Sequence, residues 1–430
     1  MSRTWTELRP LGDINTYPYS LAMSDNGVYI LAVAAPYGSS PVLSRSANSG
    51  TTWAEIAPPD EGENIAYWTS CAVSRNGQYM LITERAGWDP VAQEYYGGKI
   101  FKSSDYGVTW TDITPTPTGQ WFELASRKDC AISDDGLYIM TVVDNGSRMW
   151  SYDGGTTWGD SYTNWNWKST AMSKTGQYQV CLPLTNGSSN DAGHAVGIRS
   201  IDYGNTWTTI YPTVRTAAYK WWVVDMSADG DTVIAGALET FGEGSLWLSL
   251  NFGATWKKCL PTGDVRTKWY GASCSKHGTH LIALNYGLRL WTSDDGNRTW
   301  TEERPAGDRD GNWYCCCMSD NGMLALVSEY GGRFWKGTLP AVPSPGFTSC
   351  YWDTQTSGQT TTAGTAVGKT TAQMETQSTF VNWDFTDTWN VPDSCYPWLR
   401  TQFVAVRNGC TCAAHSFPWI GHFQLSHITV

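Results

Sequence analysis

An eight-residue pattern, Ser-x-Asp-x-Gly-x-Thr-Trp, recurs along the chain and limits the folds that are open to it. Ser103–Trp110 is a full copy, some copies carry Asn in place of Asp, and Thr292–Trp300 reads as a copy one residue longer. The six copies end at Trp53, Trp110, Trp158, Trp207, Trp256 and Trp300. Successive Trp residues lie 57, 48, 49, 49 and 44 positions apart, which gives a unit of about 49 residues. A period in this range is typical of solenoids and propellers.

A second turn pattern, Ser-x-x-Gly between apolar residues, alternates with the first. Its seven copies are Ser24–Gly27, Ser74–Gly77, Ser133–Gly136, Ser173–Gly176, Ser227–Gly230, Ser275–Gly278 and Ser319–Gly322. The 430 residues include 43 Gly and 25 Trp, whereas charged residues make up only 16%. Glycine-rich turns between short apolar and aromatic runs favour β-strands, while helical proteins are rich in Ala, Leu, Glu and Lys. The sequence therefore predicts an all-β fold.

The two ends of the repeat region complement each other. Arg3–Leu8 (RTWTEL) resembles the strand that follows the Thr-Trp of other units, such as Thr109–Ile113. The last unit ends near Phe334–Gly337 without a closing motif or a final strand. A first strand that completes the last sheet leaves no free edge at the seam of a ring. We therefore expect a seven-bladed β-propeller of four-stranded antiparallel blades that is closed by the N-terminal strand.

Residues 1–340 resemble the Asp-box (BNR) repeat β-propeller family through copies such as SSDYGVTW, SYDGGTTW and SIDYGNTW. That family includes sialidases, xyloglucan-degrading enzymes, sortilin-type receptors and photosystem assembly factors. The resemblance therefore implies the fold and leaves the function open.

The residues of the box have a structural explanation. The glycine permits the positive φ of a hairpin turn, the Ser and the Asp or Asn form hydrogen bonds with the turn backbone, and the Trp covers the hairpin. A catalytic or metal-binding role is the alternative. We expect structural roles for Asp105, Asp153, Asp202, Asp294, Trp53, Trp110, Trp158, Trp207, Trp256 and Trp300.

The composition changes after the repeats. We divide the chain into a propeller at 1–338, a Pro-rich linker at 339–346 and a small β-rich C-terminal segment at 347–430. Residues 347–400, which contain YWDTQTSG, GKTTAQM and YPWLR, resemble the segment that follows GLUG repeats in bacterial and phage surface adhesins. This resemblance implies adhesion and contact with other structural subunits. The alternative is a β-rich cap that only packs.

Charge and apolar patterning exclude some classes of function. The formal net charge is −11, which argues against a nucleic-acid binder because such a protein needs a basic face. No apolar run approaches the roughly 18 residues of a membrane span. The first residues lack the apolar core of a cleaved signal peptide. We expect a virion or extracellular surface location reached without a cleaved signal, and otherwise a cytoplasmic one.

The sequence shows no recognisable catalytic constellation. The Arg-Ile-Pro of sialidases is absent, and the six His residues fit no triad or metalloprotease motif. Acidic residues of the predicted loops suit no defined glycosidase pair; they are Glu61, Glu63, Asp89, Glu94, Glu239 and Glu243. We therefore expect no cofactor, apart from a weak Ca²⁺ candidate. Asp308, Asp310 and Asn312 alternate as in the first half of an EF-hand loop, and an ordinary turn is the alternative.

Five Trp residues recur six positions before the Ser of the second pattern. They are Trp68, Trp167, Trp221, Trp269 and Trp313. In a propeller these positions begin the innermost strands, near one end of the central channel. A ring of aromatic side chains there could stack on sugar rings, and repetition would make the binding multivalent. The alternative is that the Trp residues pack between blades.

The leading hypothesis is a non-enzymatic, surface-displayed binding or structural protein. In its concrete form it is a phage or virus-like particle subunit that contacts a host-surface glycan or receptor and other structural subunits. A propeller-type glycoside hydrolase is the first alternative, and an assembly scaffold is the second.

Overall fold

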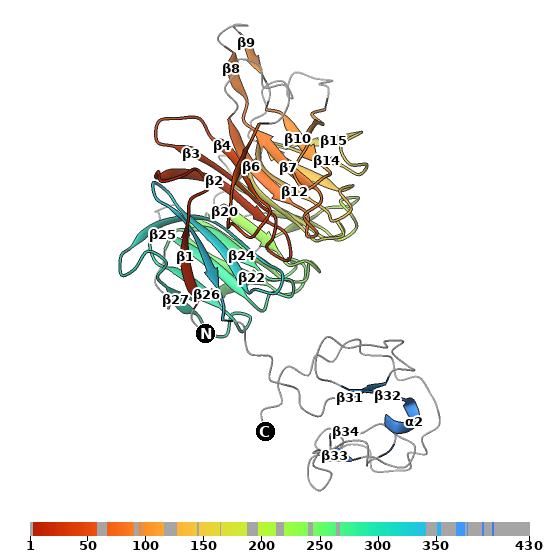
Figure 1. The fold of residues 1–430 in the computed structure, drawn as a ribbon. Coiled ribbons are helices and arrows are strands. Elements are labelled where there is room, and N and C mark those ends of the chain that lie inside the picture. Colours follow the sequence, from red (N-terminus) through yellow and green to blue (C-terminus); the bar gives the residue numbers. More distant parts are fainter. Residues whose placement is uncertain are drawn as a thin grey trace. The chain divides into compact units, whose positions relative to one another are not determined.

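The structure is a computed structural model that divides into two compact units, Met1–Pro340 and Ala341–Val430 (Figure 1). It describes residues 3–57, 67–89, 94–96, 98–115, 127–143, 146–163, 165–186, 197–211, 219–239, 244–263 and 267–340 of the first unit. In the second unit it describes 351–353, 367–374, 376, 389–390 and 398–399.

The described part of the second unit is small. β31 (Tyr351–Asp353) pairs in parallel with β32 (Val367–Lys369), and β33 (Trp389–Asn390) pairs with β34 (Trp398–Leu399). A single turn of helix, α2 (Thr371–Met374), follows β32. Most of the adhesin-like stretch at 347–400 and all of 401–430 lie outside the described residues.

Five four-stranded antiparallel sheets make up most of the first unit, which is an all-β propeller. In each sheet the strands pair in chain order. The first sheet contains β2 (Thr16–Met23), β3 (Ile30–Pro36), β4 (Val42–Ser46) and β5 (Ala54–Ile56). The second contains β6 (Trp68–Val73), β7 (Met80–Glu84), β10 (Ile100–Ser103) and β11 (Thr111–Asp112). A hairpin of β8 (Gly87–Asp89) and β9 (Glu94–Tyr96) lies between β7 and β10 in the chain.

The other three four-stranded sheets repeat this order. The third sheet contains β12 (Arg127–Ile132), β13 (Ile139–Val143), β14 (Ser147–Ser151) and β15 (Gly159–Tyr162). The fourth contains β16 (Trp165–Met172), β17 (Gln179–Asn186), β18 (Gly197–Ser200) and β19 (Thr208–Ile210). The fifth contains β20 (Tyr219–Met226), β21 (Val233–Glu239), β22 (Gly244–Ser249) and β23 (Lys257–Cys259).

The remaining eight strands form a single sheet, so the predicted count of seven four-stranded blades is wrong and five are found. The sheet contains β1 (Thr4–Leu8), β24 (Trp269–Cys274), β25 (Leu281–Leu288), β26 (Leu290–Ser293), β27 (Thr301–Glu303), β28 (Gly311–Met318), β29 (Leu324–Glu329) and β30 (Phe334–Thr338). Asn285 in β25 pairs with Trp269, the first residue of β24. The end of β25 therefore continues past β24 and pairs with β28 instead, through Tyr286 and Asn312.

The predicted closure needs a similar correction. β1 does pair with β30, from Thr4 opposite Thr338 to Leu8 opposite Phe334, as the complementary ends of the repeat region suggested. Strand pairing nevertheless does not close the sheets into one hydrogen-bonded ring, because the five four-stranded sheets remain separate ladders.

Packing joins neighbouring sheets where the ladders do not. Each Ser-x-x-Gly glycine has a positive φ and lies against a side chain of the repeat unit that precedes it around the ring. A Cβ at Gly176 would lie 2.6 Å from the ring of Tyr138, and one at Gly27 would lie 2.4 Å from Leu324. The second contact joins the first sheet to the last by side-chain packing.

The Asp-box turns form as the sequence predicts. Asp105 accepts hydrogen bonds from Ser103 Oγ (2.8 Å), the Thr109 amide (2.8 Å) and Thr109 Oγ1 (2.6 Å). Tyr106 and Gly107 both have positive φ, 63° and 81°. Two consecutive left-handed residues produce the tight turn, and the Asp holds it closed.

The sixth copy requires a correction. Asp295, and not Asp294, takes the box position, because Asp295 accepts hydrogen bonds from the Thr299 amide (2.9 Å) and from Thr299 Oγ1 (2.6 Å). Asn297 replaces the glycine with a φ of 75°, a conformation that Asn tolerates better than most residues. The copy therefore has the normal length. Asp294 faces His280 Nδ1 at 2.8 Å instead.

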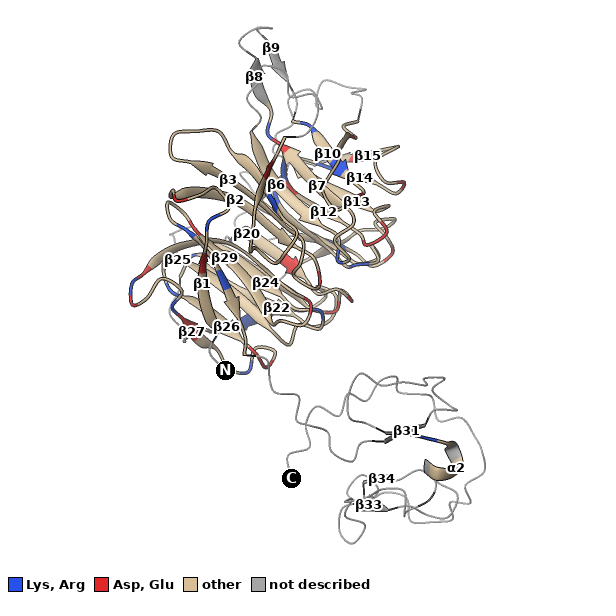
Figure 2. Cartoon of the chain, viewed as in Figure 1, with Lys and Arg blue, Asp and Glu red and all other residues tan. Residues whose placement is uncertain are grey.

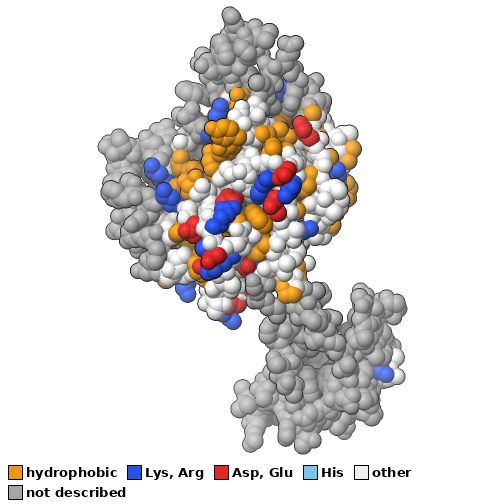
Figure 3. Space-filling model, turned by 60° about the vertical axis from the view of Figure 1, so that its left-hand side comes forward, with side chains coloured by type: hydrophobic (Ala, Val, Ile, Leu, Met, Phe, Trp, Pro, Cys, Tyr) orange, Lys and Arg blue, Asp and Glu red, His pale blue; other side chains and the backbone are white. Residues whose placement is uncertain are grey.

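Charged residues lie mainly at turns and strand ends, and strand interiors carry few of them (Figure 2). On one face basic and acidic side chains lie side by side (Figure 3). Ion pairs of this kind include Arg304 with Glu302 and with Asp308, both at 2.8 Å. Among the described residues, none of the helices has the length and apolar character needed to cross a membrane.

Candidate functional site

A cavity of about 270 Å³ follows the axis of the propeller. One strand of each four-stranded sheet and two strands of the eight-stranded sheet line it: β2, β6, β12, β16, β20, β24 and β28. These strands all run in the same direction, from an end that we call the mouth to the Ser-x-x-Gly turns, which we call the floor. The channel is the candidate functional site.

The floor is crossed by one arginine. Arg75 follows β6, and its guanidinium donates to the carbonyl of Met226 (2.9 Å), at the end of β20, and to the Asp320 carboxylate, just beyond β28. Asp25 lies 3.8 Å from Arg75 Nε. Burial and the neighbouring Asp320 raise the pKa of Asp25 to about 7, although Arg75 opposes this shift. The charges of the floor therefore compensate one another.

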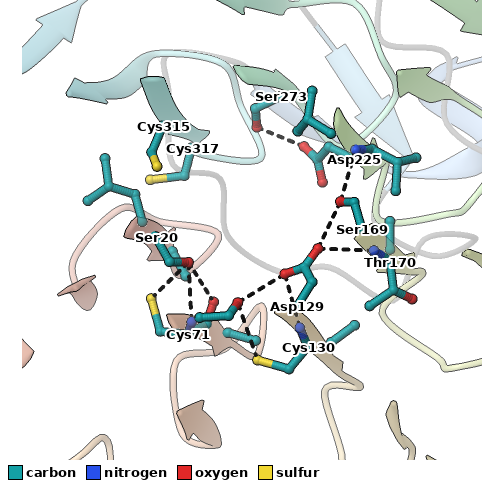
Figure 4. A pocket seen from close by; sticks show the side chains of 18 of the residues that line it. Ser20, Cys71, Asp129, Cys130, Ser169, Thr170, Asp225, Ser273, Cys315 and Cys317 are labelled. Carbon is teal, nitrogen blue, oxygen red and sulfur yellow. Dashed lines mark hydrogen bonds between the residues drawn. The ribbon is translucent and has the colours of Figure 1, made fainter. Parts of the chain in front are cut away.

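The middle of the channel contains Asp129, whose carboxylate is fully engaged (Figure 4). One oxygen accepts from Ser70 Oγ (2.9 Å) and the Cys130 amide (3.0 Å). The other accepts from Ser169 Oγ (2.8 Å) and the Thr170 amide (3.0 Å). Burial raises the pKa of Asp129 in spite of these bonds. The group connects three neighbouring sheets, which is a structural role.

Asp225, on β20, is held in the same manner (Figure 4). It accepts hydrogen bonds from Ser273 Oγ (2.7 Å) and from the amides of Cys274 (2.9 Å) and Met226 (2.8 Å). The two carboxylates of the described channel lining therefore already have hydrogen-bond donors on both oxygens, and neither is placed to exchange a proton with a substrate.

Thiols also line the channel. The eight described cysteines are free. Burial raises the pKa values of Cys71 and Cys315 to about 12. Since the thiolate is the nucleophilic form, these thiols are inert at neutral pH and behave as small apolar groups.

A β-bulge shapes the mouth at the start of every inner strand. The strand registers shift at Pro18/Ser20, Trp68/Ser70, Arg127/Asp129, Trp167/Ser169, Trp221/Val223, Trp269/Gly271 and Trp313/Cys316. A bulge inserts an unpaired residue and re-aims its side chain. The inserted residues line the channel; they are Tyr19, Thr69, Lys128, Lys168, Trp222, Tyr270 and Tyr314 with Cys315.

Aromatic side chains form a continuous series along one side of the mouth, which we call the aromatic arc: Tyr37, Tyr17, Tyr330, Tyr314, Tyr270 and Trp222, with Tyr286 beside Tyr270 at 4.8 Å. Neighbouring ring centroids lie 4.6–5.8 Å apart, from Tyr17 with Tyr330 at 4.6 Å to Tyr17 with Tyr37 at 5.8 Å. Tyr37 is 82% exposed and Tyr330 40%. At the Trp222 end of the arc, Lys168 Nζ lies 4.2 Å from the centre of the Trp222 ring.

The five Trp residues predicted to face the channel do not lie in it. Trp68, Trp167, Trp221, Trp269 and Trp313 are 0–3% exposed and belong to the core clusters between sheets. Burial of this extent leaves no ring face for a sugar, which supports the packing alternative. The channel-facing residue is the next one in each strand, as Trp222 beside Trp221 shows. Period-2 alternation does not reveal this, because the bulge interrupts it.

The two carboxylates of the Ca²⁺ candidate form ion pairs with arginine side chains. Asp308 lies 3.0 Å from Arg289 and 2.8 Å from Arg304, and Asp310 lies 3.3 Å from Arg289. Asn312 pairs with Tyr286 in the sheet. Among the residues that the structure describes, no three His, Cys, Asp or Glu side chains form a group suited to a metal. The side chains of the predicted acidic loop residues, Glu61, Glu63, Asp89, Glu94, Glu239 and Glu243, lie outside the described set.

Comparisons with known proteins agree with this fold. The family model of the BNR-Asp box repeat matches residues 100–113, which contain the second box. A search of curated proteins finds no match. YCF48 from Cyanidioschyzon merolae has a similar structure, with a TM-score of 0.55 and 13% identity over 77% of this chain and 98% of that one.

Two further solved structures are similar over most of the chain. YCF48 bound to D1 peptide has a TM-score of 0.56 and 13% identity, over 79% of this chain and 96% of that one. A catalytically inactive virginiamycin B lyase from Staphylococcus aureus with quinupristin has a TM-score of 0.53 and 15% identity, over 79% of this chain and 100% of that one. At these identities the likeness shows the propeller fold alone.

Proposed function

We propose that this protein is a non-enzymatic binding propeller that holds a glycan at the mouth of its channel. The observation that carries the proposal is the aromatic arc, whose ring contacts run without a break from Tyr37 to Trp222. Aromatic rings offer large, rigid contact area with a polar edge, which suits the apolar faces and the hydroxyl groups of sugars.

The surroundings of the arc support binding rather than hydrolysis. A glycosidase needs one carboxylic acid and one carboxylate on either side of the scissile bond. Asp129 and Asp225, the carboxylates that line the channel, instead accept hydrogen bonds from Ser hydroxyls and backbone amides. The virion location stays a prediction of the sequence.

The test is binding of soluble polysaccharides by the full chain. Isothermal titration with mixed-linkage β-glucan, xyloglucan, dextran and polygalacturonate should find at least one ligand. Trp222→Ala and Tyr270→Ala should each weaken that binding about fivefold or more, since each removes a stacking face of about 1 kcal/mol or more. Tyr203→Ala is the matched control, because Tyr203 is 36% exposed in an Asp-box turn at the other end of the sheets.

Three results would overturn the proposal. Release of new reducing ends from a polysaccharide would show a hydrolase. Equal loss of binding in the control and in the arc variants would show that the arc is not the site. Binding of extended peptides but of no glycan would favour a peptide partner or a scaffold. A peptide is the second candidate because the similar YCF48 structure is described as bound to D1 peptide.

A further inference from the structure

The described residues block the channel at its floor, and this restricts how a polymer can bind. Arg75 begins at the end of β6 and reaches Met226 at the end of β20, three inner strands further around the ring. It also reaches Asp320 and Asp25, which follow β28 and β2. A side chain that contacts strands on opposite sides of the channel must cross its axis.

Backbone hydrogen bonds fix this floor. The residue after each motif Ser bonds to its counterpart in a neighbouring sheet: Asp25 N to Arg75 O (2.6 Å), Asp134 N to Lys174 O (2.8 Å), and Asp320 N to Asp25 O (2.9 Å). Arg75 N donates to the Asp134 carboxylate at 2.6 Å. Opening the floor would break a charge cluster and several of these bonds together, so a chain cannot pass through it.

The volume of the channel sets the length of chain that it can hold. Its roughly 270 Å³ lies just below the range of about 300–1,000 Å³ that buries a drug-sized ligand. The channel therefore has room for about one or two sugar units. The aromatic arc at the mouth is long enough to contact the units that follow.

From these observations we infer that the channel is a subsite for the end of a glycan chain. The terminal sugar enters from the mouth and stops above Arg75, and the aromatic arc stacks the next units. This inference rests on the proposed function and adds to it that chain ends, and not internal segments, are the ligand.

The lining of the channel supports this arrangement. Four small residues on consecutive inner strands, Ala22, Ala72, Ala131 and Ala171, line the cavity and keep it wide. Ala22 and Ala72 are only partly buried, and each also packs against a core cluster between sheets. Larger side chains at these two positions would fill the subsite without touching the aromatic arc.

The experiment compares a polysaccharide that binds in the titrations above with its own enzymatic digest, at equal mass of sugar, on the full wild-type chain. Chain-end recognition predicts that the number of sites filled follows the concentration of ends, so a digest with tenfold more ends should saturate the protein at about one tenth of the mass. Blocking the reducing or the non-reducing ends chemically should abolish most of this gain.

Equal binding per mass of polymer and digest, unaffected by end blocking, would overturn the inference and leave the proposed function standing. Absence of binding to every glycan would overturn both. Ala72→Leu provides an independent measurement: it should weaken binding of the digest at least tenfold, whereas Ala254→Leu, in an exposed box turn, should not. If Ala72→Leu fails to fold, the end-blocking result on the wild-type protein decides the question alone.

Discussion

At the floor of the channel the inner strands end in the same Ser-x-x-Gly turn, whereas at the mouth each begins with a bulge whose inserted residue varies. Every floor turn repeats one set of bonds, such as Ser173 Oγ accepting from the Tyr178 amide at 3.1 Å. The inserted residues at the mouth range from Tyr and Trp to Lys and Thr. In repeat proteins the shared features build the stack, and those that vary between repeats are free to serve binding.

Effects on stability and effects on binding should therefore separate between the two ends of the channel. Changes at the floor and in the strand framework should lower stability, and changes at the mouth should alter binding with little loss of stability.

Removal of residues 1–9 should prevent stable folding. The deletion removes all five residue pairs between β1 and β30, together with Leu8, which is 7% exposed, and the bond from Trp5 Nε1 to Glu303 (2.8 Å). Each apolar side chain of this size contributes about 1.5–3 kcal/mol, and a typical domain has only about 5–15 kcal/mol in total.

Thermal melts and solubility check this prediction. Deletion of residues 401–430 is the control and should leave the propeller folded. A chain without residues 1–9 that melts within about 2 °C of the full-length protein would show that the propeller does not need β1.

Arg75→Met should destabilise the protein by about 3–5 kcal/mol, because Asp25 and Asp320 then lose the cation between them. Arg85→Met is the matched change at the mouth, where Arg85 lies 5.2 Å from the centre of the Tyr67 ring. An exposed contact of that kind is worth about 0.5–1 kcal/mol. Urea unfolding measures both variants, and equal losses would contradict the separation.

A pair of glycines separates backbone strain from packing. Gly176, at the floor, has a φ of +78° and Tyr138 2.6 Å from the position of an added Cβ. Gly287, at the mouth end of β25, has a φ of +85° and nothing within 4 Å. Both Ala variants should lose about 1–2 kcal/mol to the left-handed backbone. Gly176→Ala should lose about 1–3 kcal/mol more through overpacking, and equal losses would show that the Tyr138 contact is soft.

The sequence was sufficient to predict the framework because the framework repeats. The Asp-box turns, the pairing of β1 with β30 and the short antiparallel strands all follow from patterns that recur at a fixed period. The repeat did not predict the number of four-stranded sheets, because that number depends on whether β25 continues past the residue that pairs with Trp269 and so reaches β28. The position of Asp295 was missed because Asp294 and Asp295 are identical in type and Asn297 replaces the expected glycine.

The candidate site was missed by one residue. The motif spacing located the start of each inner strand correctly but selected Trp221 and its equivalents, which lie in the core. A bulge depends on hydrogen bonding between strands, and a single sequence contains little signal for it. Tyr37, Tyr286 and Tyr330 of the aromatic arc each precede a glycine of positive φ at a strand end, so a repeated Tyr-Gly pair is the sequence signal that could have located them. Tyr17 has no such signal, and only the fold brings it to Tyr330.

The smallest expected effect is in the pH dependence of stability, where two carboxylates should act in opposite directions. The folded-state pKa of Asp25 is raised to about 7, mainly by burial, so the folded protein binds a proton that the unfolded chain releases near pH 4. The contribution of Asp25 therefore falls as the pH rises from about 4 to about 7. Hydrogen bonds from Thr109 lower the pKa of Asp105 to about 2, so its contribution is present above about pH 4 and is lost towards pH 2.

Urea unfolding between pH 2 and pH 8 distinguishes the two carboxylates. Asp25→Asn should flatten the decline in stability between about pH 4 and pH 7, and Asp105→Asn should flatten only the decline below about pH 4. Glycan stacking on the aromatic arc should be unchanged by Asp25→Asn across the same range, since Asp25 does not line the channel. An affinity that follows the titration of Asp25 would show that floor and mouth are coupled, and that the separation between them does not hold.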